Sequence, residues 1–212
     1  MVFTLTDDLA PELYPLAWLL GRWRGEGVVG YPGIEESAFV QDVEFDHDGG
    51  PYLRYTSTIR LLAIPDDAAA LLGDAALAGD PVVVGDAGIE GAEVAVGPAP
   101  GTTDGPVWAT ETGFWRIAPE RPAELAEDQH PLEILLADPA GHLSLYLGAV
   151  GKGRIEVASD LVASTSTAAK VSAGTRLYGL VQGDLMWAWD LAAFGQPLQS
   201  YASARLERVE PS

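Results

Sequence analysis

The chain contains no cysteine. Disulfides, thiolate nucleophiles, iron–sulfur clusters and cysteine-rich zinc sites are therefore excluded. Basic residues are scarce as well: 12 lysines and arginines stand against 31 acids, which gives a net charge of −19 at pH 7. A surface this acidic repels polyanions, so we expect neither a nucleic-acid partner nor an anionic membrane surface as a partner.

Long apolar runs are missing too, and none could span a bilayer as a helix. The first twenty residues, MVFTLTDDLAPELYPLAWLL, begin with acids rather than with the basic segment of a secretory signal. We therefore expect a cytoplasmic protein. At 212 residues the chain is long enough for one domain with a sizeable core. The sequence leaves the oligomeric state open, a homodimer included.

Helical periodicity is confined to the N-terminal region. Residues 11–20 predict a short helix, with Asp8 as its cap and with Leu13, Leu16 and Leu20 on one face. Beyond this segment, glycine, proline and aspartate break the sequence into short runs.

Those short runs predict strands. From Leu53 to Leu61 every second residue is apolar or small and the residues between are threonine or arginine, which is the two-residue period of a strand with one wet side. Similar runs, most of them separated by turn residues, occupy 132–137, 142–150, 154–163, 175–181, 185–191 and 201–209. Many short strands with almost no helix predict an all-β fold, and closure removes exposed edges, so we expect a closed antiparallel barrel of about ten strands.

One segment departs from this pattern. Residues 63–108 are rich in alanine, glycine, proline and aspartate, with no lysine or arginine. Within them 66–77 predicts a brief helix and 82–84 a scrap of strand. A long insertion at a hairpin tip costs little loop entropy, so it is compatible with a single barrel spanning 1–212. We interpret it as an acidic surface loop, with a lid or a partner surface as the alternatives.

A glycine-rich motif follows the helix. Residues 21–34 read GRWRGEGVVGYPGI, in which glycine lets the backbone bend sharply and approach its neighbours, and Trp23 can plug the end of a barrel. A phosphate-binding loop is excluded because the motif lacks the Lys-Ser/Thr pair and the strand-before, helix-after context.

This motif resembles the start of nitrobindins, small β-barrels related in shape to fatty-acid-binding proteins that hold a ferric haem. The family pattern is G-x-W-x-G-x-G followed closely by G-x-Y-P-T-I, and glycine stands at position 33 where a threonine is usual. The matching residues are Gly21, Trp23, Gly25, Gly27, Tyr31, Pro32 and Ile34. Further matches at 43–53, 111–116, 133–137 and 195–199 extend the resemblance over nearly the whole chain outside 63–108.

The resemblance makes Tyr201 the residue of interest. Family members read G-Q-P-L-x-x-H-L-x-A near the C-terminus, and their histidine is the proximal ligand of haem iron. This chain has Tyr201 at that position. A phenol has an ordinary pKa of about 10 and must lose its proton to bind iron well, which usually needs a nearby cation. Arg205 lies ~13 Å further along an extended strand, so the cation would have to come from another strand.

Strand alternation and the resemblance disagree about Tyr201. Alternation groups it with Ser203, Arg205 and Glu207 on the more polar side of the last strand, whereas the resemblance places it toward the cavity. The three histidines, His47, His130 and His142, match no zinc signature and none takes the ligand position, so we expect no metal site.

Three functions follow as hypotheses. The first is a nitrobindin-like barrel that does not bind haem in the family manner, whose cavity holds a small apolar ligand or none. The second is a haem b protein that uses Tyr201 and acts on nitric oxide or peroxynitrite, as the resemblance implies. The third is an interaction module that works through 63–108. We favour the first, and with it we expect no cofactor and no enzyme activity.

Overall fold

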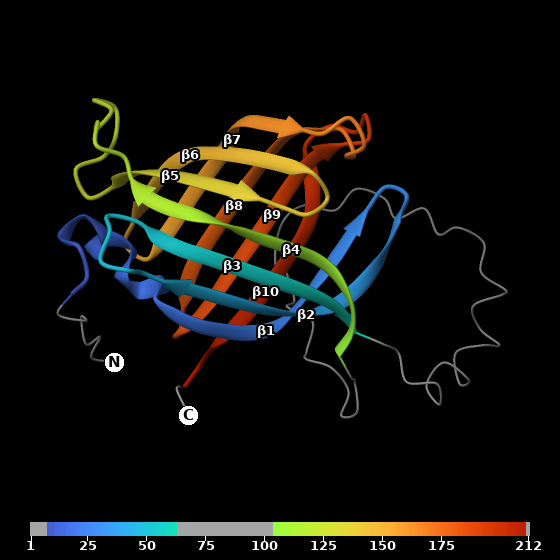
Figure 1. The fold of residues 1–212 in the computed structure, drawn as a ribbon, viewed down its shortest axis with the longest axis horizontal. Coiled ribbons are helices and arrows are strands. Elements are labelled where there is room, and N and C mark those ends of the chain that lie inside the picture. The colour runs from blue at the N-terminus through green and yellow to red at the C-terminus, as the bar shows by residue number, and fades with distance from the viewer. Residues whose placement is uncertain (1–7, 63–103, 211–212) are drawn as a thin grey trace, which may run out of the picture.

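The computed structural model describes residues 8–62 and 104–210, and they form a closed antiparallel β-barrel (Figure 1). Each strand pairs with the next along the chain, and the last pairs with the first. The predicted barrel and its ten strands are therefore confirmed. The elements are η1 (Pro11–Leu19), β1 (Gly21–Tyr31), β2 (Ile34–Asp46), β3 (Leu53–Leu62), β4 (Asp104–Ile117), β5 (His130–Ala137), β6 (His142–Gly151), β7 (Arg154–Ser164), β8 (Val171–Val181), β9 (Asp184–Ala193) and β10 (Gln199–Val209).

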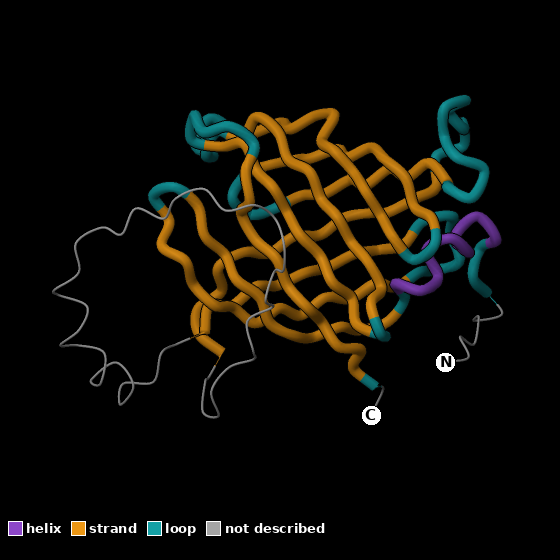
Figure 2. The backbone as a smooth tube through the Cα atoms, turned by 180° about the vertical axis from the view of Figure 1, so that it is seen from behind, coloured by secondary structure: helices purple, strands orange, loops and turns teal. Residues whose placement is uncertain are grey.

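The two-residue period decides which side chains fill the barrel. In β3 the predicted alternation holds: Leu53, Tyr55, Ser57 and Ile59 are buried, and the residues between them are more exposed. A similar alternation recurs in parts of other strands, such as residues 154–157 of β7 and 202–206 of β10. Figure 2 shows the crossing strands of the barrel from behind. The core is therefore one large apolar cluster, with a second, small cluster of Tyr31, Leu191 and Ala193.

The N-terminal helix differs from the prediction in type. It is a 3-10 helix with three residues per turn, so the buried side chains are Leu13, Leu16 and Leu19 rather than the predicted set that ended at Leu20. Pro15 lies inside it and has no N–H to donate. The prediction of Asp8 as cap was wrong, because the capping position is Ala10 and no side chain makes a capping hydrogen bond.

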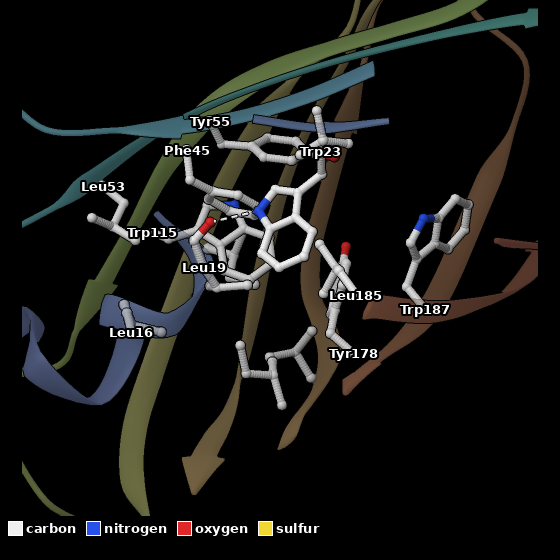
Figure 3. Close-up of a cluster of buried hydrophobic side chains, with 14 of the residues drawn as sticks. Leu16, Leu19, Trp23, Phe45, Leu53, Tyr55, Trp115, Tyr178, Leu185 and Trp187 are labelled. Atoms are coloured by element: carbon white, nitrogen blue, oxygen red, sulfur yellow. Dashed lines mark hydrogen bonds between the residues drawn. The ribbon is translucent and has the colours of Figure 1, made fainter. Parts of the chain in front are cut away.

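Trp23 fills the end of the barrel next to this helix, as predicted. Its side chain is 1% exposed, and its indole N–H donates to the Leu19 carbonyl oxygen at 2.7 Å (Figure 3). The Arg208 guanidinium lies over the indole ring, 4.1 Å from its centre. The helix, β1 and β10 are thus joined at one residue.

Two glycines of the same motif permit the β1–β10 closure. Gly25 pairs with Leu206 and Gly27 with Ala204. A Cβ atom on Gly25 would lie 2.1 Å from the Arg205 carbonyl oxygen, and one on Gly27 would lie 2.2 Å from that of Ser203. Because both obstacles are backbone atoms, any larger residue would force the two strands apart.

The acidic segment at 63–108 lies mostly outside the described residues, together with the helix and strand predicted at 66–77 and 82–84. Its last five residues, 104–108, belong to β4 and are strand rather than loop. In the part of the chain that the structure describes, no helix is long and apolar enough to cross a membrane.

Candidate functional site

A cavity of about 370 Å³ lies within the barrel, and apolar and aromatic side chains form most of its wall. Its volume falls within the range of small-molecule sites. Ile34, the last residue of the glycine-rich motif, is part of this wall. Polar and aromatic residues that line the cavity include Gln41, Ser57, Trp108, Glu111, His142, Tyr146, Arg176, Tyr178, Trp187, Trp189 and Tyr201.

A β-bulge turns Tyr201 into this cavity. In the β9–β10 ladder Ser200 pairs with Asp190 and Ala202 with Trp189, so Tyr201 is an extra residue without a partner across the ladder. After the bulge the alternation continues with Ala202 and the following even-numbered residues buried. The bulge explains why Tyr201 lines the cavity, as the family resemblance implies, although strict strand alternation puts it on the other face.

Aromatic rings enclose Tyr201. Its ring meets Trp189 edge-on with centroids 4.9 Å apart and Tyr31 edge-on at 5.9 Å. Tyr31 is itself fixed, because its hydroxyl donates to the Leu191 carbonyl oxygen at 2.9 Å and accepts from the Ala193 N–H at 3.0 Å. The motif residue Tyr31 therefore buttresses the Tyr201 ring. The turn that follows, Pro32 and Gly33, has a positive φ of 87° at Gly33, which explains glycine there.

The surroundings of Tyr201 favour its protonated, neutral form. The Trp108 indole N–H donates to its oxygen at 3.3 Å. Burial raises the pKa of Tyr201, and the Trp108 hydrogen bond acts in the opposite direction. The Glu111 carboxylate raises this pKa further, while the Arg176 guanidinium lowers it. The net direction is upward, so the neutral form is favoured.

A buried ion pair crosses the same cavity. Arg176 on β8 binds Glu111 on β4 with both ends of its guanidinium: Nη1 donates to Oε2 at 2.8 Å and Nη2 donates to Oε1. The side chains are 5% and 16% exposed. Burial opposes the charge of Arg176, but Glu111 and the neighbouring tyrosines raise its pKa well above the ordinary value. Arg176 therefore stays protonated, and its charge is balanced by the carboxylate with which it forms the ion pair.

Aromatic faces hold the guanidinium in place. Its central carbon lies 4.0 Å from the centre of the Trp189 ring and 5.0 Å from that of Tyr146. Nη1 also lies 3.4 Å from the Tyr178 hydroxyl. Burial raises the pKa of Tyr178 to about 12. A cation that could favour a phenolate at Tyr201 does come from another strand, since Arg176 is on β8, but Glu111 already neutralises it.

A second polar chain lines another part of the cavity. The Trp187 indole N–H donates to Gln41 Oε1 at 2.8 Å, and Gln41 Nε2 donates to the Ser57 hydroxyl at 2.8 Å. Gln41 and Ser57 are almost fully buried. Because these buried groups satisfy one another, the cavity wall can be polar here without a bound molecule.

The histidines differ in their positions. His142 lines the cavity, which the sequence did not indicate. Its Nε2 donates to the Ala169 carbonyl oxygen at 2.8 Å, and its Nδ1 lies 3.1 Å from Asp138 Oδ2, so both ring nitrogens are engaged. His47 lies 4.0 Å from Asp8, and His130 is exposed at the start of β5. Among the described residues no group of three or more histidines and acids could hold a metal ion.

The sequence located Tyr201 and the glycine-rich motif but missed the ion pair. Glu111 and Arg176 are 65 residues apart. One signal was available: Arg176 and Tyr178 share a face in the predicted strand at 175–181, and a charge on a face that enters a core must be paired. The sequence pattern also puts Trp108 in the insertion, whereas it lies on β4 with its indole beside Tyr201.

Comparison with known proteins places the chain in a family. Residues 12–208 match the model of the THAP4-like, heme-binding beta-barrel domain. The chain is 46% identical to a ferric nitrobindin-like protein of Beutenbergia cavernae, with 99% of this chain and 100% of that protein aligned. It is 38% identical to a peroxynitrite isomerase of Frankia casuarinae, with 97% and 90% aligned.

A solved structure agrees with the barrel. The crystal structure of Rv2717c from Mycobacterium tuberculosis superposes with a TM-score of 0.66 at 28% identity, covering 95% of this chain and 99% of that one. A family model that matches almost the entire chain, together with these relatives, determines membership. The chain belongs to the THAP4-like, heme-binding β-barrel family, the family of the nitrobindins.

Proposed function

We propose that this barrel binds a small, largely apolar molecule in its central cavity and does not hold haem in the manner of its haem-binding relatives. The observation that carries the proposal is the state of Tyr201. This residue occupies the position that the nitrobindin motif gives to the iron-ligating histidine, and it is a partly buried phenol whose pKa is raised. The remainder of the cavity wall is rich in aromatic carbon.

The cavity side chains fit haem iron poorly. Haem would supply ferric iron, which Tyr201 could bind only as a phenolate. Burial opposes that ionisation, and the Trp108 N–H already contacts the oxygen that would have to bind the metal. The other candidate donor, His142, has both ring nitrogens engaged. Holding iron here would require breaking contacts that the fold already makes.

The same wall suits an apolar ligand. Trp187 and Trp189 are partly or fully buried in the barrel and line the cavity together with Tyr146 and Tyr178. Aromatic surfaces of this kind supply most of the binding energy of small-molecule sites. Gln41 and Ser57, and likewise Glu111 and Arg176, pair with each other along the wall, whereas Trp189 Nε1 and Arg176 Nε are buried without a hydrogen-bond partner among the described residues.

The proposal is tested with N-phenyl-1-naphthylamine, an uncharged aromatic amine whose fluorescence rises in apolar surroundings. We expect saturable uptake of one molecule per chain, with quenching of tryptophan fluorescence because Trp187 and Trp189 form the wall. A dye signal that grows without saturation, or no signal from the folded protein, would remove the ligand-binding proposal.

The second candidate is a haem protein with peroxynitrite isomerase activity, and it is favoured by relatives of that name at 35–38% identity. Two relatives of higher identity, 46% and 41%, carry the name ferric nitrobindin-like protein instead. Hemin uptake distinguishes the candidates: stoichiometric binding with the spectrum of a tyrosinate-bound ferric haem would favour the isomerase. The third hypothesis, an interaction module at 63–108, rests on residues of which only 104–108 are described.

A further inference from the structure

The described wall of the cavity contains one permanently charged cation, the Arg176 guanidinium, and the Glu111 carboxylate is bound to it. Among the described residues of the cavity wall, Arg176 is the only lysine or arginine. A buried guanidinium in an apolar pocket is a ready site for a carboxylate or sulfonate, because its planar fork matches two acceptor oxygens. In this structure Glu111 fills the fork with two hydrogen bonds.

The guanidinium is not free to turn toward a second anion. Trp189 and Tyr146 cover its faces at 4.0 and 5.0 Å, and its side chain is only 5% exposed. A ligand anion would therefore have to take the place of Glu111. Glu111 is on β4 and points into the barrel, so displacing it would leave a carboxylate without a cation in the cavity.

We infer that Glu111 determines the ligand class of this barrel: it blocks the anion site at Arg176, so that the cavity accepts uncharged aromatic or aliphatic molecules and rejects carboxylates and sulfonates. The inference rests on the proposed ligand-binding function and adds the selection against charge. Because the pair is neutral, an uncharged ligand leaves the charge balance of the cavity intact. An anion adds one negative charge, and the described cavity wall has no second lysine or arginine to compensate it.

Two probes of nearly the same shape test this selection. N-phenyl-1-naphthylamine is uncharged, and 8-anilino-1-naphthalenesulfonate is the same framework with a sulfonate. In the wild type we expect the uncharged probe to bind at least about tenfold more tightly. In Glu111→Gln the guanidinium fork is released, and we expect the sulfonate probe to gain about tenfold or more while the uncharged probe changes little. The bound sulfonate must be displaced by the uncharged probe, which shows that both occupy the cavity.

A matched control removes the effect of overall charge. Glu133 also binds an arginine, Arg116, through a 2.6 Å contact, but this pair lies on the outer surface of the barrel. Glu133→Gln changes the net charge of the chain by the same amount as Glu111→Gln. We expect it to bind both probes as the wild type does. A similar gain of sulfonate binding in both variants would overturn the inference, since it would reflect weaker general repulsion.

Chemical rescue provides a second measurement in case Glu111→Gln is unstable. Glu111→Ala opens a space beside Arg176 that formate can fill. We expect sodium formate to raise the melting temperature of this variant, or to restore its folding, more than sodium chloride does and more than formate does for the wild type. Absence of such rescue overturns the inference.

The failures can be told apart. If the wild type binds both probes equally well in the cavity, Glu111 does not select against charge, and the ligand-binding function stands. If the wild type takes up neither probe, the proposed function itself fails.

Discussion

Replacing the two members of the buried pair, singly and together, tests how the cavity is held together. Glu111→Leu leaves the Arg176 guanidinium in an apolar site from which it cannot lose its proton, and Arg176→Met leaves a carboxylate that can take up a proton. Removing one partner of a buried pair typically costs about 3–5 kcal/mol. We expect Glu111→Leu to reach that range, because its partner is 5% exposed, and Arg176→Met to cost less.

The double variant Glu111→Leu/Arg176→Met has no uncompensated charge. Replacing a buried ion pair by apolar residues of similar volume is often neutral or stabilising by about 1–4 kcal/mol, so we expect the double variant to be at least as stable as the better single variant. Urea denaturation followed by tryptophan fluorescence measures all four proteins, and with a slope of roughly 2 kcal/mol per molar a loss of ~4 kcal/mol moves the midpoint by about 2 M. A cost below about 1 kcal/mol for Glu111→Leu, the range of exposed pairs, would refute the placement of this pair inside the barrel.

Three further predictions concern the fold and its titration. Gly27→Ala should destabilise the protein by about 1–3 kcal/mol or more in the urea assay, because its Cβ would lie 2.2 Å from the Ser203 carbonyl oxygen. The control Gly179→Ala has open space around the new methyl group and should change stability by less than about 0.5 kcal/mol. Trp23→Phe should cost about 1–3 kcal/mol in thermal or urea unfolding, because it leaves the buried Leu19 carbonyl without its 2.7 Å donor; a variant as stable as the wild type would show that this bond is not made. Burial raises the pKa of Tyr178 to about 12 and raises that of Tyr55 as well, so both stay protonated in the folded state above the ordinary value of about 10. The contribution of Tyr178 to stability is complete below pH ~10 and is lost as the pH rises through about 12. Tyrosinate absorbance and circular dichroism recorded together would show this as ionisation coupled to unfolding.

The strands could be predicted because the pattern that identifies each one lies within a few consecutive residues. Alternation in 53–61 identified the inward-facing Leu53, Tyr55 and Ser57, and glycine or proline marked the turns. The helix type was missed: an α-helical period groups Leu13 and Leu16 with Leu20, whereas the 3-10 helix buries Leu19 in its place. Local pattern therefore sufficed for the barrel but not for the geometry of every element.

The geometry of the site depends on two features that strand alternation cannot predict. The bulge at Tyr201 shifts the register by one residue, and no glycine or proline marks it in the sequence. The Arg176–Glu111 pair joins two strands that are not neighbours in the barrel, so no hairpin rule brings them together. Closure of the barrel places these side chains across the cavity from one another, which only the three-dimensional structure reveals.

The central claim, that Tyr201 does not hold haem in this barrel, is tested most directly by titrating hemin into the wild type and into Tyr201→His while recording the Soret absorption. We expect no saturable Soret shift from the wild type. Tyr201→His should give a stoichiometric shift, because the cavity remains and a neutral nitrogen donor has been restored. A stoichiometric shift in the wild type, abolished by Tyr201→Phe, would contradict the claim.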